Sequence, residues 1–183
     1  MLEQYLVEHC SPTLAGLKTA NLFSVRFIDE EELKQHMKQC EKKFQNKGVS
    51  LILLKKRADT ALIYVCRREK LQKDLQKNGV KEFLKKYGYE NTDEEEAIAC
   101  LKARLNLEEK FPHEIGLFLG YPLGDVIGFI ENAGKNSKCA GCWKVYCNEC
   151  ETMKLFEKFK KCTRIYTKLW RQGTSVEKLT VAA

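Results

Sequence analysis

Two runs rich in β-forming residues, 49–55 and 60–66, are separated only by residues 56–59. So short a connection allows only antiparallel pairing, because parallel neighbours need a crossover of about a dozen residues. A third run, 21–28, predicts a further strand, and amphipathic helical patterns follow without a repeating βαβ order. The sequence therefore predicts an α+β fold, with a small, largely antiparallel sheet packed with several amphipathic helices.

Capping and stop signals mark where the helices are expected to begin and end. Asp29 and Glu32 form a capping-box pattern, and the helix that follows is expected to end at 46–48. This helix is predicted to bury an apolar stripe formed by Leu33, Met37, Cys40 and Phe44. Further helices are expected at 2–8, 67–77, 80–87, 123–132 and 151–171. Two more are expected to begin at Ser11-Pro12 and at a Thr92/Glu95 capping box. The segment 111–120 is expected to be a loop leading into a strand, and 143–146 a short strand.

The length of 183 residues is that of one domain, so residues 1–183 are predicted to form a single α+β domain. All apolar runs are far shorter than the ~20 residues that a membrane-spanning helix needs. The segment 1–12 lacks the basic start and the apolar core of a secretory signal. We therefore expect a cytoplasmic protein with no membrane partner.

The net charge of +7 comes from one segment of the chain. Residues 135–171 contain 10 Lys and Arg but only 3 Asp and Glu, and the rest of the chain is balanced. A solvated face is the simplest interpretation of the basic amphipathic helix expected at 151–171, and docking of an acidic protein partner is the alternative. A nucleic-acid partner is not expected, because the sequence shows no aromatic stacking platform and no known binding motif.

Two CxxC pairs occur in the segment CAGCWKVYCNEC, at Cys139, Cys142, Cys147 and Cys150. Nine cysteines in a chain expected in the reducing cytosol favour metal or redox chemistry over disulfides. Four thiolates complete the ligand set of a zinc ion or an iron–sulfur cluster. The four cysteines are therefore the predicted metal ligands, and zinc or an iron–sulfur cluster is the predicted cofactor.

The WKVY spacer between the two pairs restricts how closely the four thiols can approach one another. If the spacer is extended at ~3.3 Å per residue, Cys142 and Cys147 lie about 16 Å apart, with their side chains on opposite faces. A bend in the spacer would bring all four thiols together, and outside ligands such as Cys10, Cys162 or His113 would also complete a site. Thiols with a purely structural role are the remaining alternative.

The segment His9-Cys10-Ser11-Pro12 is a second candidate site. A thiol just ahead of a helix start lies near backbone N–H groups and the positive end of the helix dipole, which favour the thiolate. The sequence is thus compatible with a thiol-dependent enzyme in which Cys10 is the nucleophile and His9 or His113 is the base. A packing role for Cys10 is the alternative.

A third candidate is the segment 111–128, FPHEIGLFLGYPLGDVIG. A strand running through Gly120 into a helix that begins near Pro122 would present free N–H groups to an anion. His113 and Glu114 would supply an acid/base pair or a metal ligand, so both are candidate catalytic residues. The alternative is a glycine-rich turn that allows close backbone packing.

Three segments, 9–16 (HCSPTLAG), 111–126 (FPHEIGLFLGYPLGDV) and 143–146 (WKVY), resemble the bacterial domain-of-unknown-function family 3793, and the resemblance runs nearly end to end. It implies a cytosolic protein of an anaerobic bacterium and carries over no activity. Many members of that family have an acidic residue at the position of Gly124 and Gly-Tyr in place of Gly141-Cys142. A metal role for the cysteines would then hold for a subset of the family.

We hypothesise that the three segments converge on one pocket bearing His9, Cys10, His113 and Glu114, a hypothesis that fails if His113 lies more than roughly 15 Å from Cys10. The function expected from the sequence is that of a cysteine-cluster metal-binding protein of iron or redox physiology. A thiol-dependent enzyme and a basic adaptor that binds an acidic partner are the alternatives. Whether the chain is an enzyme is left open.

Overall fold

The computed structural model describes residues 2–107 and 110–182. The chain forms two compact units, which are described separately below. Unit 1 comprises Met1–Leu71 and Cys162–Ala183, and unit 2 comprises Gln72–Lys161. The predicted α+β class is confirmed, since helices accompany a small antiparallel sheet. Compact units are not by themselves separate domains, and the single domain over residues 1–183 stays a prediction.

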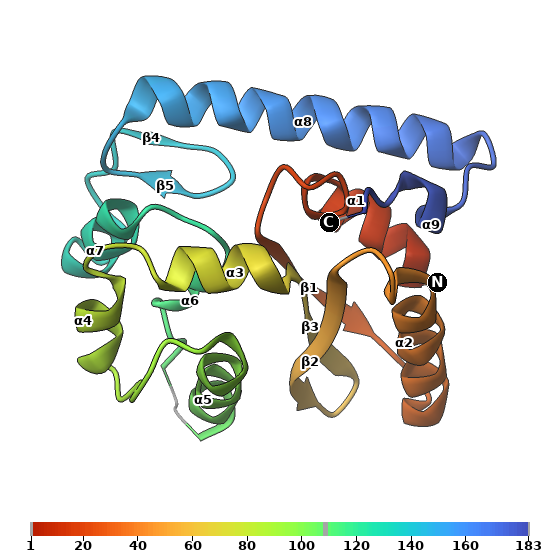
Figure 1. Cartoon of the computed structure of the whole chain (residues 1–183), viewed down its shortest axis with the longest axis horizontal. Helices are drawn as coiled ribbons and strands as arrows, with labels where there is room; N and C mark the ends of the chain where they lie inside the picture. Colours follow the sequence, from red (N-terminus) through yellow and green to blue (C-terminus); the bar gives the residue numbers. More distant parts are fainter. Residues whose placement is uncertain (1, 108–109, 183) are drawn as a thin grey trace. The chain divides into compact units, whose positions relative to one another are not determined.

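Unit 1 is built around a three-stranded antiparallel sheet with the order β1-β3-β2, whose strands lie side by side in Figure 1. In β3, Ile63 lies opposite Phe23 of β1 and Leu53 of β2. The two runs separated by residues 56–59 pair as β2 and β3, so the predicted hairpin is confirmed. The strands are β1 (Ala20–Arg26), β2 (Val49–Arg57) and β3 (Thr60–Arg67).

Helices pack on this sheet through apolar stripes. The four residues predicted to form the buried stripe at 33–44, which include Cys40, are all buried in α2. Asp29 is the N-cap of α2 and accepts a hydrogen bond from the amide of Glu31 at 2.8 Å. The helices assigned wholly to unit 1 are α1 (Leu2–Leu14), α2 (Glu30–Phe44) and α9 (Val176–Leu179), while α3 (Arg68–Leu75) and α8 (Glu149–Arg171) each run from one unit into the other.

The prediction that a second helix starts at Ser11-Pro12 is wrong, because α1 continues through both residues. The Ser11 hydroxyl donates to the carbonyl of Val7 and therefore does not cap a new helix. Pro12 removes one backbone hydrogen bond from the last turn. The buried stripe that includes Cys10 and Leu14 continues at helical spacing across Pro12, so the packing of this face outweighs the lost bond.

Arg67, at the end of β3, donates hydrogen bonds to the end of α1 and to the segment after α9. Its guanidinium is buried, and Nη2 donates to the carbonyls of Leu14 and Val181, both at 2.7 Å. Nε donates to the carbonyl of Thr13, also at 2.7 Å. The end of α1 and the segment after α9 are thus held by one side chain.

Unit 2 consists of short helices and one small hairpin. A buried cluster of Val145, Phe156 and Phe159 packs with Trp143 and Leu155. Within the described ranges, no helix of either unit combines the length and apolar character needed to cross a membrane. The elements assigned wholly to unit 2 are α4 (Val80–Lys85), α5 (Glu94–Leu107), α6 (Ile115–Phe118), α7 (Leu123–Glu131), β4 (Cys139–Ala140) and β5 (Lys144–Val145).

Two local predictions in unit 2 were wrong. The segment 111–120 contains the helical turn α6 and no strand; its residues Ile115, Leu117 and Phe118 are all buried, and a short buried apolar run is compatible with either structure. The N-terminus of α5 is capped by Asp93, whose Oδ1 accepts from the Glu95 amide at 3.1 Å, and not by Thr92. Aspartate is a strong N-cap, since its short side chain reaches the free amides of the first turn.

Candidate ligand pocket and cysteine hairpin

Unit 2 contains a cavity of about 390 Å³, which we call the aromatic pocket, lined by residues of the segments 111–129 and 140–144. The first segment supplies α6, the turn after it and α7, and the second supplies the tip of the β4–β5 hairpin. The lining is mostly apolar and includes several aromatic rings. Two segments singled out in the sequence therefore form one cavity wall.

The rings of the pocket hold one another in place. Tyr121 stacks on Trp143 with ring centroids 4.5 Å apart and planes inclined by 23°. The Trp143 ring also meets Phe156 edge-on, again at 4.5 Å. His113 and Phe129 form another pair, 5.0 Å apart. Because ring pairs of this geometry are favourable beyond the area they bury, the indole of Trp143 has a fixed position.

The carboxylate of Asp125 joins α7 to the β4–β5 hairpin through hydrogen bonds. Its Oδ2 accepts a hydrogen bond from Trp143 Nε1 at 2.8 Å, and its Oδ1 accepts from the amides of Tyr146 and Cys147 at 2.8 and 2.9 Å. Burial acts to raise the pKa of this carboxyl, but the hydrogen bonds outweigh it, so the pKa lies below its ordinary value. Asp125 is therefore a buried carboxylate with a positioning role.

Two glycines allow the close approaches that shape the pocket. A Cβ on Gly116 would lie 2.8 Å from Val126 Cγ2, so only glycine lets α6 approach α7 this closely. A Cβ on Gly141 would lie 2.3 Å from the Phe156 ring. Both substitutions would force the wall to move, and the close contact at Gly116 agrees with the packing alternative considered for the segment 111–128.

The side chains of the adjacent residues His113 and Glu114 lie in different surroundings. His113 lines the aromatic pocket. Glu114 is only 1% exposed, and its Oε1 accepts hydrogen bonds from Arg104 Nε at 2.6 Å and from the Tyr89 hydroxyl at 3.2 Å. Glu114 is thus engaged in a buried ion pair and is not among the residues that line the cavity.

The two cysteines of the first CxxC pair lie in different surroundings on the β4–β5 hairpin. Cys142 is exposed and lines the aromatic pocket, whereas Cys139 packs against the cluster of Val145 and Phe156. In the second pair, the Cys147 thiol donates to Asp125 Oδ1 at 3.1 Å, and Cys150 is exposed in the first turn of α8.

Thiols in these surroundings favour the protonated form. Burial, followed by the Asp125 carboxylate, raises the pKa of Cys147 to about 11. Burial and the carboxylate of Glu149 raise the pKa of Cys139. Among the described residues, no three His, Cys, Asp or Glu side chains form a group able to hold a metal ion. Metal binding by the four cysteines accordingly stays a prediction.

His9 and Cys10 lie in unit 1, on α1. Cys10 is completely buried, and burial raises its pKa, with the charge of Lys18 acting weakly in the opposite direction. The His9 ring stacks on Phe23 at 5.9 Å. These surroundings favour a packing role for Cys10. Since His113 and Glu114 belong to unit 2, the hypothesis that all four residues share one pocket stays untested.

Residues 6–180 match the model of the family described as protein of unknown function (DUF3793). The chain belongs to this family. The resemblance carried by the segments 9–16, 111–126 and 143–146 is therefore confirmed. No curated protein and no solved structure matches the chain.

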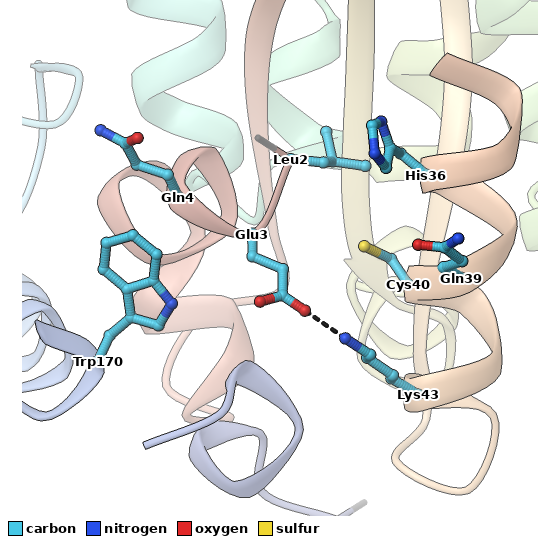
Figure 2. Close-up of a pocket in the computed structure, with 8 residues that line it drawn as sticks. All are labelled: Leu2, Glu3, Gln4, His36, Gln39, Cys40, Lys43 and Trp170. Atoms are coloured by element: carbon cyan, nitrogen blue, oxygen red, sulfur yellow. Dashed lines mark hydrogen bonds and ion pairs between the residues drawn. The ribbon is translucent and has the colours of Figure 1, made fainter. Parts of the chain in front are cut away.

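A second cavity, of about 300 Å³, lies in unit 1 of this DUF3793 chain and is shown in Figure 2. One face of α2 lines it with side chains at helical spacing, from His36 to Lys43, and Trp170 forms another part of the wall. Glu3 of α1 and Lys43 point toward each other and form an ion pair (Figure 2). The charged groups of this cavity are already paired, so it carries less chemistry than the aromatic pocket.

Sequence reasoning missed the roles of Asp125, Tyr121 and Trp143 in this DUF3793 chain. A signal was present, because Asp125 is the one charged residue in the otherwise apolar segment 115–130. A carboxylate is rarely buried unless hydrogen bonds satisfy it, so its place in such a run indicates a buried acceptor.

Proposed function

We propose that this DUF3793 chain is a small-molecule-binding protein and that the aromatic pocket of unit 2 is its binding site. A cavity of about 390 Å³ falls within the range of ligand pockets, roughly 300 to 1,000 Å³. Such pockets combine an apolar wall with a few polar groups, here Asp125, His113 and Lys144. The observation that carries the proposal is that two segments bearing the family resemblance, 111–126 and 143–146, both contribute to this wall.

The pocket is well suited to binding because contacts within the protein hold its aromatic wall in place. Asp125 and Tyr121 fix the position of Trp143, and Phe156 supports it from another side. A preorganised wall reduces the conformational entropy that binding would otherwise cost. A ligand would therefore gain stacking contacts without having to order these side chains.

Binding of the neutral fluorescent probe N-phenylnaphthylamine tests the proposal. The probe is expected to bind the full chain and to gain fluorescence in the apolar cavity. Replacement of the lining residue Ala140 by phenylalanine should fill the cavity and weaken binding at least ~10-fold. Ala99→Phe is the matched control, because Ala99 is exposed on α5 and outside the pocket. Equal binding by both variants, or no binding by the unmodified chain, would contradict the proposal.

The cysteine hairpin supports a second candidate function, the binding of zinc or an iron–sulfur cluster by Cys139, Cys142, Cys147 and Cys150. One observation favours it: Cys139 and Cys142 lie on one short hairpin, and the second pair follows directly, with Cys150 in the first turn of the next helix. A rearrangement of that hairpin would bring soft sulfur ligands around one metal centre. We further propose that the chain works in the reducing cytosol, where thiols stay available to bind a metal.

Metal analysis of protein purified without oxygen tests this second candidate. About one equivalent of zinc, or iron with matching sulfide, is the expected result, and Cys147→Ser should abolish it. Cys100→Ser is the control, because Cys100 lies in unit 2 but outside the hairpin. Protein that stays free of zinc and iron after anaerobic loading would exclude this candidate and leave the aromatic pocket untouched.

A further inference from the structure

We infer that the ligand of the aromatic pocket is a neutral, planar heteroaromatic compound whose ring N–H donates a hydrogen bond to Asp125. The inference rests on the proposed function and adds the chemical class of the ligand. Three properties of the wall lead to it: its aromatic rings, its buried carboxylate and the distribution of hydrogen bonds on that carboxylate.

The rings set the shape of the ligand. Phe111, His113, Tyr121, Phe129 and Trp143 all line the cavity. Aromatic side chains bind flat π-systems through offset stacking or edge-to-face contacts, which a saturated or branched aliphatic ligand cannot match. The Tyr121–Trp143 and His113–Phe129 pairs both contribute to the same cavity, so a planar ring has aromatic partners from two parts of the wall.

The carboxylate sets the charge of the ligand. Asp125 is 2% exposed and is the one acidic residue among the described residues that line the pocket. It accepts hydrogen bonds from four donors and donates none among the described residues, as a carboxylate does. An anionic ligand beside a buried carboxylate would be repelled, because like charges interact strongly where water is excluded. The four neutral donors on Asp125 already stabilise its charge, and the Lys144 ammonium on the same wall donates to the carbonyl of Gly134, so a neutral donor is a better complement than a cationic one.

The distribution of hydrogen bonds leaves one acceptor site for the ligand. Oδ1 accepts from two backbone amides and from the Cys147 thiol, whereas Oδ2 accepts one hydrogen bond, from Trp143 Nε1, among the described residues. A carboxylate oxygen has two lone pairs, so Oδ2 can accept a further donor. A ring N–H lies in the plane of the ring, and it can therefore reach Oδ2 while the ring faces stack on the wall.

A pair of ring compounds tests the inference on the full, unmodified chain. Indole has a ring N–H, and N-methylindole has the same flat ring without the donor. Ligand-observed NMR should show that indole binds at least ~10-fold more tightly, because it adds a hydrogen bond to a charged acceptor, which N-methylindole cannot form. In Asp125→Asn the preference for indole should fall by about the same factor.

The outcomes separate this inference from the proposed function. Equal binding of indole and N-methylindole would overturn the role of Asp125 as the acceptor. Binding of N-phenylnaphthylamine without either indole would overturn the ligand class while the pocket remains a binding site. Failure of all three compounds would overturn both. If Asp125→Asn also loses N-phenylnaphthylamine, the variant has lost the pocket, and the comparison of the two indoles on the unmodified chain decides the matter.

Discussion

The Asp125 carboxylate accepts a hydrogen bond from the Trp143 indole nitrogen at 2.8 Å, across 18 positions of the sequence. This bond joins α7 to the β4–β5 hairpin, and the amides of Tyr146 and Cys147 reinforce it on the other carboxylate oxygen. One side chain thereby fixes the stacking surface of the aromatic pocket and supplies its acidic group.

Replacement of Asp125 by alanine is expected to lower the free energy of unfolding of the chain by about 3 kcal/mol. The substitution leaves several buried donors without an acceptor, and each unsatisfied donor costs roughly 1 to 3 kcal/mol. Urea unfolding followed by the fluorescence of Trp143 measures the effect, in a Trp170→Phe background that removes the other tryptophan. Glu131→Ala, at the exposed end of α7, is the control, and an equal change in both variants would refute the role of Asp125.

The lowered pKa of Asp125 predicts a dependence of stability on pH. A carboxyl whose pKa is lower in the folded chain than in the unfolded chain contributes stability above the unfolded value, about 3.9 for aspartate. That contribution is lost as the pH falls through the folded-state pKa. The free energy of unfolding of the chain should therefore decrease below about pH 4, and the decrease should be smaller in Asp125→Asn. Identical pH profiles for the two proteins would show that this carboxyl does not contribute.

The elements predicted correctly from the sequence are those whose signals are local. The stripe from Leu33 to Phe44 repeats every three or four residues, and the α2 helix that buries it was predicted within a few residues. The β2–β3 hairpin was also predicted correctly, because its short connection allows only antiparallel pairing. The helix α8 was expected from residue 151 and begins at Glu149.

The features that sequence reasoning missed depend on contacts between distant segments. The short apolar run in α6 fits a buried strand as well as a helical turn, and only its surroundings decide between them. The partners of Asp125 lie about twenty residues further along the chain, so its positioning role has no local signature. Activation of Cys10 was one of two alternatives and required a helix start at Ser11-Pro12, but α1 continues through Cys10 and buries it, which favours the packing alternative.

The buried pair of Glu114 and Arg104 provides a prediction that separates stability from binding. Glu114→Gln is expected to lower the free energy of unfolding of the chain by about 3 kcal/mol, because it leaves the Arg104 guanidinium without its charged partner. Binding of N-phenylnaphthylamine to the folded variant should be unchanged, since Glu114 does not line the aromatic pocket. Both quantities are measured on the same protein, by urea unfolding and by fluorescence titration. A large loss of binding with unchanged stability would place Glu114 in the site after all.

The cysteines are expected to react with iodoacetamide in an order set by exposure and pKa. Cys142 and Cys150 are exposed and should be modified first. The buried cysteines of unit 1 should be protected until the chain unfolds, since burial raises the pKa of Cys40 and Cys162 to about 11 and that of Cys10 further, and only the thiolate reacts. Mass spectrometry of quenched samples gives the rate at each position.

A bound probe should change this order at one position. Because Cys142 lines the aromatic pocket and Cys150 does not, saturating N-phenylnaphthylamine is expected to slow the alkylation of Cys142 at least several-fold while Cys150 reacts as before. Cys150 is therefore the internal control for any general effect of the probe on the reagent. Equal protection of the two thiols, or rapid modification of Cys10 in the folded chain, would contradict the surroundings described for these cysteines. Selective protection of Cys142 would in turn place the probe beside the hairpin tip, where Trp143 forms the wall.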